Sequence, residues 1–206
     1  MQPSVHAVIL AGGKSSRMGV PKDQLPWREG TFLTEMGKEI LAMGLPCLIV
    51  SNEPERIPAE LAEQDGVSVT PDLVPSAGPV SGLVTAFRLC AEDVLLVLSC
   101  DLPFMDRTQM ASLLAYAAGK DGWDAVIPTA QGRIHPLCAL YRKSTQPRWE
   151  NALEQGDLRL MNTIRQLFVL EVPDGWLDPW ALFNVNTPEE YDMAIREEKR
   201  RKTGQQ

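Results

Sequence analysis

Short apolar runs of strand length alternate with stretches of helical periodicity along the whole chain. The apolar runs are rich in valine, isoleucine and leucine, show no polar alternation, and are bounded by glycine, proline or polar residues. Because runs of this kind are buried on both faces, they predict the strands of a covered sheet. The predicted strands are residues 5–10, 46–51, 94–99, 125–127, 137–141, 168–172 and 182–185.

Apolar positions at helical spacing predict helices between these runs. Residues 32–43 form one such stretch, and Pro79 suits the first position of a second helix. A third helix is predicted after Asp106, which together with Gln109 resembles a capping box. The apolar faces of the second and third helices comprise Val80, Leu83, Val84, Phe87 and Cys90, and Met110, Leu113, Leu114 and Ala117, respectively.

The last predicted helix has the clearest start in the chain. Thr187 is a good N-cap, Pro188 suits the first helical position, and Glu190 stands three residues after the cap. The helix then runs into the charged stretch 196–202, and chain ends that nothing ties down are poorly ordered. We therefore expect residues 199–206 to form a frayed tail.

Alternating strands and helices indicate the α/β class, with three layers (α/β/α) and a mostly parallel sheet covered by helices on both faces. We expect one domain over residues 1–198, made of a regular half, 1–128, and a less regular half, 129–198. Ligands bind such sheets beyond the carboxyl ends of the strands. The loops after Leu10, Ser51 and Ser99 are therefore predicted to carry the chemistry.

Composition places the chain among ordinary globular domains. It has 206 residues, of which 44% are hydrophobic and 23% charged, enough to bury a full core. Twenty basic against 27 acidic side chains leave a net charge of −7. A nucleic-acid-binding protein needs a basic face, which this balance does not supply. An acidic protein that binds phosphates must do so locally, with a few directed cations and backbone amides.

Cysteine usage and the apolar runs exclude several other classes. The cysteines at positions 47, 90, 100 and 138 form no CxxC pair, and only two histidines accompany them, so their spacing does not favour a zinc site or a redox motif. We expect free cysteines in the core of a protein of the reducing cytoplasm. The first ten residues lack the basic segment of a signal peptide. No apolar run approaches the roughly 18 residues of a membrane helix.

The most informative stretch follows the first predicted strand and spans residues 10–22, Leu-Ala-Gly-Gly-Lys-Ser-Ser-Arg-Met-Gly-Val-Pro-Lys. Glycines let backbone amides approach phosphate oxygens, and Arg17 and Lys22 add positive charge. The stretch is not a Walker loop, because Val8 stands where that motif needs glycine, and it is not a GxGxxG fingerprint. A surface turn with two solvated cations is the alternative, but the order strand, Gly-Gly, Arg, Gly, Lys favours phosphate binding.

This stretch resembles the signature of the nucleotidyltransferases that share a Rossmann-like, glycosyltransferase-A type fold, the nucleotide-diphospho-sugar transferase type. Within that superfamily the chain is most similar to the molybdenum cofactor guanylyltransferases, the MobA-like family, over most of its length. Gly-Gly after Leu10-Ala11 favours the guanylyl branch over the cytidylyl branch. The further matching blocks are Asp72 with Gly-Pro-Val-Ser-Gly-Leu at 78–83, Ser-Cys-Asp-Leu-Pro-Phe at 99–104, Arg-Ile-His-Pro-Leu-Cys-Ala-Leu-Tyr at 133–141, and Phe-Asn-Val-Asn-Thr-Pro-Glu-Glu at 183–190.

The resemblance departs from the family pattern at two positions. Pro21 precedes Lys22 where the family usually has aspartate, and Ser99 precedes Cys100 where proline is common. Neither departure removes a charge that nucleotidyl transfer needs.

The resemblance implies roles for individual residues, with residues 1–128 as the nucleotide-binding half and 129–198 as the acceptor-side half. It makes Arg17, Lys22 and Asp101 catalytic and Asp101 the Mg²⁺ ligand. A strand-end carboxylate near a phosphate loop suits Mg²⁺, although Asp101 could instead cap a turn. The implied nucleotide-binding residues are Leu10, Ala11, Gly12, Gly13, Lys22, Asn52, Asp72 and Asp101, and the acceptor-side residues are His135, Asn184 and Asn186.

Read without the resemblance, several of these residues keep an ordinary structural interpretation. Asn52 is then a turn residue, Asp72 a loop acid, His135 a packed or capping histidine, and Asn186 a residue leading into the last helix.

The implied reaction is transfer of GMP from GTP to a molybdopterin phosphomonoester, with release of pyrophosphate. The acceptor phosphate is already anionic at neutral pH, since its second pKa is near about 6, so no general base is required. GTP and the molybdopterin acceptor are the implied partners, and proteins that deliver the cofactor are compatible with them; neither nucleic acid nor membrane is expected. A cytidylyl- or sugar-phosphate nucleotidyltransferase on the same fold and a non-catalytic nucleotide-binding protein remain the alternatives.

Overall fold

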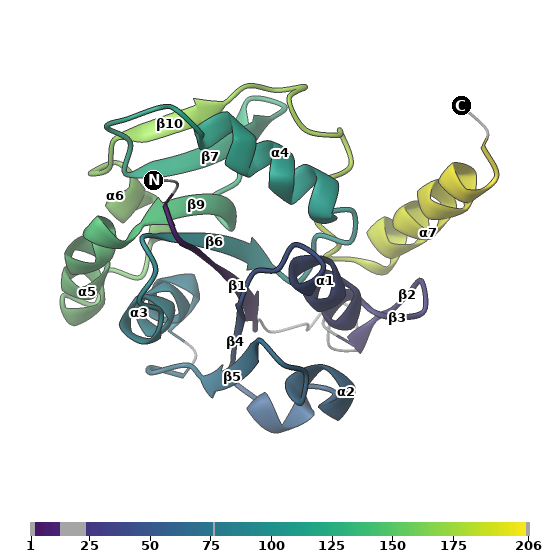
Figure 1. Cartoon of the computed structure of the whole chain (residues 1–206), viewed down its shortest axis with the longest axis horizontal. Coiled ribbons are helices and arrows are strands. Elements are labelled where there is room, and N and C mark those ends of the chain that lie inside the picture. The colour runs from purple at the N-terminus through teal and green to yellow at the C-terminus, as the bar shows by residue number, and fades with distance from the viewer. Residues whose placement is uncertain (1–2, 13–23, 76, 205–206) are drawn as a thin grey trace.

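The computed structural model describes residues 3–12, 24–75 and 77–204, and these residues build one central sheet of eight strands (Figure 1). The strands lie in the order β10-β7-β9-β6-β1-β4-β5, with β8 paired to β7 beside this path. The strands are β1 (Val5–Ala11), β4 (Cys47–Ser51), β5 (Val67–Pro71), β6 (Val94–Ser99), β7 (Ala125–Ala130), β8 (Arg133–Ile134), β9 (Cys138–Arg142) and β10 (Val169–Val172).

The direction of pairing confirms the predicted mostly parallel sheet. Strands β6, β1, β4 and β5 run parallel to one another, and β10 runs parallel to β7. Only β9, among the seven strands of the main path, lies antiparallel to both of its neighbours, β6 and β7. The sheet runs without interruption through both proposed halves of the chain, and position 128 lies inside β7.

Helices cover both faces of the sheet, as expected for a three-layer fold (Figure 1). Alternate residues of β1 face opposite layers: Ala7 and Ile9 pack with α1, α2 and α4, whereas Val8 and Leu10 pack with α3, α5 and α6. This two-sided burial explains the unbroken apolar runs in the sequence. These helices are α1 (Phe32–Leu41), α2 (Ala59–Ala62), α3 (Pro79–Leu89), α4 (Arg107–Ala117), α5 (Gln146–Glu154) and α6 (Leu160–Ile164).

A third apolar cluster joins a small hairpin to the last helix. The hairpin is formed by β2 (Pro26–Trp27) and β3 (Gly30–Thr31), and the helix is α7 (Pro188–Lys202). Trp27 packs edge-on against Phe32 and Phe104, with ring centroids 5.3 and 5.2 Å apart. The Tyr191 hydroxyl of α7 donates to the Pro26 carbonyl at 2.7 Å. The hairpin is thereby fixed to α7 and to the loop after β6.

Two local expectations about the last third of the chain are wrong. Residues 182–185 are not a strand: the Val185 amide donates to the Asp101 carbonyl at 3.0 Å, but the segment pairs with no neighbouring strand among the described residues. The frayed tail does not begin at 199, because α7 continues to Lys202. Arg200 and Arg201 both donate to the Glu197 carboxylate, at 2.7 Å each, which links the last turn of α7 to the turn before it and lowers the pKa of Glu197 to about 2.

The predicted starts of α3, α4 and α7 agree with the structure except in one detail, whereas α2, α5 and α6 were not predicted. Asp106 caps α4 by accepting from the amides of Thr108 and Gln109 at 2.9 and 3.0 Å. The predicted capping box is only half formed, because the Gln109 side chain accepts from the Asp178 amide at 2.8 Å instead. Pro79 does occupy the first turn of α3, as expected.

The structure also bears on the cysteines and on membrane-spanning helices. The four cysteines are buried and free of disulfides, which confirms the predicted core cysteines. Among the described residues, none of the helices combines the length and apolar character needed to cross a membrane.

The start of α7 generates a prediction about stability. The Thr187 hydroxyl accepts from the Glu190 amide at 3.2 Å, and the Glu190 carboxylate accepts from the Thr187 amide at 2.9 Å. Replacing an N-cap threonine by alanine costs about 1 kcal/mol. We expect Thr187→Ala to lower the free energy of unfolding by about this amount in urea denaturation, whereas Thr187→Ser, which keeps the hydroxyl, stays near wild type. Equal stability of all three proteins would contradict the cap.

Candidate active site

The carboxyl ends of four parallel strands bring the predicted site residues to one edge of the sheet. Residue pairing places Leu10 of β1 opposite Ser99 of β6 and Val50 of β4, and Ser51 of β4 opposite Pro71 of β5. Reading along this edge from β6 to β5, the residues that follow the strands are Asp101, Gly12, Asn52 and Asp72. The carboxyl ends of β1 and β6, which lie about 90 positions apart in the sequence, are therefore neighbours in the fold.

The end of β1 lies at the centre of this row. Leu10 and Ala11 are buried, and Gly12 is exposed just beyond them. A Cβ atom at Gly12 would lie 3.2 Å from Nδ2 of the Asn52 side chain, which is closer than most real Cβ contacts. Glycine at position 12 thus keeps the space in front of Asn52 open, and it leaves the backbone of β1 accessible to a ligand.

Asp72 is held in place by hydroxyl groups of α3. Its Oδ1 accepts from the hydroxyls of Ser81, in a short contact, and Thr85, at 3.3 Å. The same hydroxyls accept from the amides of Val74 and Leu73 at 3.0 and 3.1 Å. These bonds fasten the loop after β5 to the first two turns of α3 and fix the position of the Asp72 carboxylate.

Close packing of α3 against β1 brings Asp72 near Leu10. A Cβ atom at Gly82 would lie 3.0 Å from Leu10 Cδ2 and 3.9 Å from Asp72 Oδ2, so this helix position has little room for a side chain. The N-cap of α3 is Gly78, whose φ of 76° lies in the left-handed region that favours glycine. The two glycines of the motif at 78–83 are therefore needed for different purposes. Gly78 adopts a left-handed backbone conformation, and Gly82 lets α3 approach β1 closely.

On the other side of β1, Asp101 is a largely buried carboxylate with 8% of its surface exposed. The Asn184 side-chain amide donates to Asp101 Oδ1 at 2.8 Å, and the Val185 amide donates to the Asp101 carbonyl at 3.0 Å. The Cys100 amide in turn donates to the Leu10 carbonyl at 3.4 Å. The loop after β6 is thus tied both to the end of β1 and to the segment that precedes α7.

The other two residues that the resemblance assigns to the acceptor side, Asn186 and His135, have backbone bonds to α7 and to β7. The Asn186 amide donates to the Glu190 carboxylate at 2.7 Å, which makes its backbone part of the start of α7. His135 leads into β9, and its amide donates to the Pro128 carbonyl at 2.9 Å. Burial lowers the pKa of the half-buried His135, so the imidazole is neutral at pH 7. Because β9 runs antiparallel to β6, its first residues lie at the same sheet edge as Asp101.

The structure thus brings together Leu10, Ala11, Gly12, Asn52 and Asp72 on one side, and Asp101 with Asn184 on the other. Gly13, Arg17 and Lys22 lie outside the described residues.

Sequence reasoning missed the roles of Ser81 and Thr85, which position Asp72. The signal for them was two hydroxyl residues at i, i+4 spacing within the buried, apolar face of α3. For Asn184, which the resemblance assigns to the acceptor side, the structure adds a contact with the site, because its amide donates to the Asp101 carboxylate.

A family model described as the MobA-like NTP transferase domain matches residues 7–169. A Bacillus subtilis (strain 168) protein named "Probable molybdenum cofactor guanylyltransferase" is 34% identical over 196 residues, covering 93% of this chain and 94% of that protein. A Clostridium perfringens (strain SM101 / Type A) protein of the same name is 32% identical over 201 residues, covering 92% and 96%.

Among solved structures, the molybdopterin-guanine dinucleotide biosynthesis protein A of Archaeoglobus fulgidus superimposes with a TM-score of 0.76 at 22% identity. The superposition covers 95% of this chain and 99% of that one, and it shows that the two chains share a fold. Together with the residue row at the sheet edge, the match of the family model over most of the chain assigns the family. The chain belongs to the MobA-like NTP transferase family.

Proposed function

We propose that this protein transfers GMP from GTP to the phosphate of a molybdopterin acceptor and releases pyrophosphate. The proposal rests on one observation in a member of this family. Asp101, Gly12, Asn52 and Asp72 follow four neighbouring strands and lie in one row at the same edge of the sheet. The relatives' names supply the nucleotide and the acceptor.

The nucleoside is expected to lie over the end of β1 and the loops after β4 and β5. Backbone groups of residues 10–12 offer fixed donors and acceptors, and Asn52 adds a side-chain amide. Asp72, oriented by Ser81 and Thr85, offers a carboxylate that can accept from ribose hydroxyls or base N–H groups. Gly12 leaves room for a large base because it has no side chain.

Asp101 suits a bound Mg²⁺ ion by the chemistry of its surroundings. Mg²⁺ prefers carboxylate and phosphate oxygens together with water, and Asp101 is a carboxylate at a strand end, next to the predicted phosphate loop. When bound, the ion neutralises charge on the triphosphate. The Asn184 amide, bonded to Oδ1, fixes the orientation of the carboxylate that would hold it. Arg17 and Lys22 are proposed to add positive charge along the same phosphates.

The reaction requires positioning more than proton transfer. An oxygen of the acceptor phosphate forms a bond to the α-phosphorus of GTP, and the bond from that phosphorus to the leaving pyrophosphate oxygen breaks. The acceptor oxygen carries negative charge already, so no side chain has to remove a proton. His135 and Asn186, on the acceptor side, are proposed to orient the acceptor. Catalysis then rests on alignment and on charge neutralisation around Asp101, Lys22 and Arg17.

The first test removes the charge of Asp101. Asp101→Asn keeps the side-chain shape but weakens the site for the metal ion, and we expect transfer to fall by at least ~100-fold, about 2.7 kcal/mol in the barrier. The measurement is pyrophosphate release from GTP in the presence of the acceptor. Asp106→Asn is the matched control, because asparagine also caps a helix well and this residue lies outside the proposed site. A folded, fully active Asp101→Asn protein would overturn the assignment.

The second test concerns the base. Guanine and cytosine present opposite donor and acceptor patterns, and each buried polar group left unpaired costs about 1–3 kcal/mol. We therefore expect GTP with Mg²⁺ to bind at least ~100-fold more tightly than CTP with Mg²⁺ in titration calorimetry, since two such mismatches cost about 2–6 kcal/mol and ~100-fold corresponds to about 2.7 kcal/mol. Equal affinities, or tighter binding of CTP, would place the protein in the cytidylyl branch. Binding of GTP without any transfer would instead indicate a nucleotide-binding protein that lacks catalysis.

The third test compares two lysines of the glycine loop. Lys22 occupies the signature position for a charge on the triphosphate, whereas Lys14 stands outside it. Lys22→Ala is expected to reduce transfer strongly, and Lys14→Ala to reduce it much less. Both substitutions remove one positive charge from the same segment, so their comparison isolates position from net charge. An equal loss at both positions would contradict the assigned role of Lys22.

A further inference from the structure

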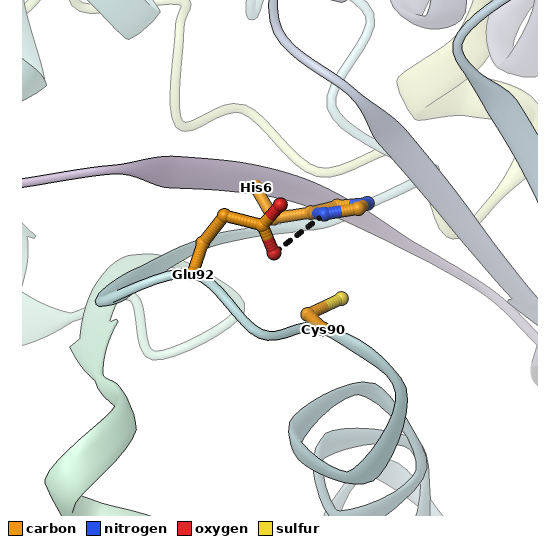
Figure 2. A group of neighbouring side chains, drawn as sticks. All are labelled: His6, Cys90 and Glu92. Atoms are coloured by element: carbon orange, nitrogen blue, oxygen red, sulfur yellow. Dashed lines mark hydrogen bonds and ion pairs between the residues drawn. The ribbon is translucent and has the colours of Figure 1, made fainter.

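Three side chains with metal-binding atoms meet at the amino edge of the sheet, opposite the edge that carries Asp101. His6 comes from the start of β1, Cys90 caps the end of α3, and Glu92 lies in the loop that leads to β6. Figure 2 shows the Glu92 carboxylate beside the imidazole ring and the Cys90 thiol facing the space between them. Sequence spacing could not reveal this group, since the fold joins positions 6 and 90.

The spacing of the three groups is close to that of a metal centre. Their ligand atoms, one per residue, lie within 4.8 Å of one another, and His6 Nδ1 is 3.0 Å from a Glu92 carboxylate oxygen. Around a tetrahedral zinc ion, nitrogen, oxygen and sulfur ligands are about 3.3–3.8 Å apart. Side-chain rotations that move atoms by about 1 Å are therefore sufficient to close the three groups around one ion.

The surroundings leave this group incompletely satisfied. Cys90 is 3% exposed, and the side chains of His6 and Glu92 are 14% and 28% exposed, so the three groups are shielded and Glu92 lies nearest to solvent. His6 Nε2 is buried and has no hydrogen-bond partner in the described part of the chain. A buried polar atom without a partner is costly and is rare in native proteins. Because Nδ1 is the ring nitrogen that faces Glu92, an ion among the three groups would bind Nδ1, and Nε2 would stay outside its coordination.

A positive charge lies close to this group, since the Lys143 ammonium group donates to the Cys90 carbonyl at 2.6 Å. Coordination to a dication deprotonates a thiol, so a bound ion would hold Cys90 as a thiolate.

We propose that His6, Cys90 and Glu92 form a binding site for a zinc ion, separate from the nucleotide site. Nitrogen, sulfur and carboxylate ligands together are typical of zinc, whereas Mg²⁺ requires oxygen ligands. Three protein ligands leave a fourth tetrahedral position, which a water molecule can fill.

The site would connect the end of α3 to the start of β1. Helix α3 supplies Ser81 and Thr85, the hydroxyls that hold Asp72, and it packs against Leu10 through Gly82. A zinc ion bound at the other end of α3 would thus fasten the helix to the sheet without touching the nucleotide. Its direct effect is on stability, because an ion that binds the folded chain raises the free energy of unfolding.

The test uses cobalt as a spectroscopic substitute for zinc. The full-length protein, stripped with a chelator, is titrated with Co²⁺, and a thiolate-to-cobalt charge-transfer band in the near ultraviolet reports coordination by sulfur. We expect one equivalent to give the band, zinc to displace it, and zinc to raise the unfolding temperature. Cys90→Ser should abolish the band. His6→Gln and Glu92→Gln should weaken zinc binding by at least about 10–100-fold, the loss typical of removing even a supporting partner of a metal site.

Two control variants separate this site from others. Cys47→Ser removes an equally buried thiol that begins the neighbouring strand β4 but packs on the opposite face of the sheet, and it should keep the band. Asp101→Asn should keep it too, since that carboxylate lies at the other edge. No band in the wild-type protein, a band that survives Cys90→Ser, or zinc affinity unchanged in His6→Gln (an adventitious ion only) would each overturn the proposal.

Discussion

Parallel pairing of β6, β1, β4 and β5 is the constraint on which the rest of the structure depends. Because these strands run in the same direction, their carboxyl ends meet at one edge and their amino ends at the other. The first edge collects Gly12, Asn52, Asp72 and Asp101. The opposite edge collects the starts of β1 and β6, and with them His6 and Glu92. The parallel direction of these strands thus places two chemically different groups of residues at opposite edges of the sheet.

Helix α3 links these two edges. Its first turns carry Gly82, which lets the helix approach Leu10, and the hydroxyls of Ser81 and Thr85, which hold Asp72. Its last turn ends at Cys90, beside His6. Polar side chains within an otherwise apolar, buried helix face are expensive unless they are bonded, and here each hydroxyl bonds the loop after β5. The helix therefore acts both as part of the core and as the support of the candidate nucleotide site.

The segment before α7 has a comparable role on the other side of β1. Asn184 reaches the Asp101 carboxylate, and Val185 bonds the Asp101 backbone. The chain holds this segment through the capped start of α7 and through the aromatic cluster around Trp27 and Phe104, not through a strand ladder. A residue 83 positions after Asp101 thereby orients its side chain. This arrangement explains why the segment before α7 looks irregular in sequence yet is attached to Asp101.

The sequence alone predicted six of the seven strands on the main path of the sheet, the helix starts at Pro79 and Thr187, and the α/β class, but it missed β5, the strand that leads to Asp72. These features depend on local signals, since apolar runs, capping residues and a glycine-rich motif are readable within a few positions. The sequence could not determine the partner of Gln109, the irregular path of residues 182–185, the hydroxyl support of Asp72, the bond from Asn184 to Asp101, or the meeting of His6 with Cys90. Each of these is a contact between segments that only folding brings together, and only the tertiary structure decided them.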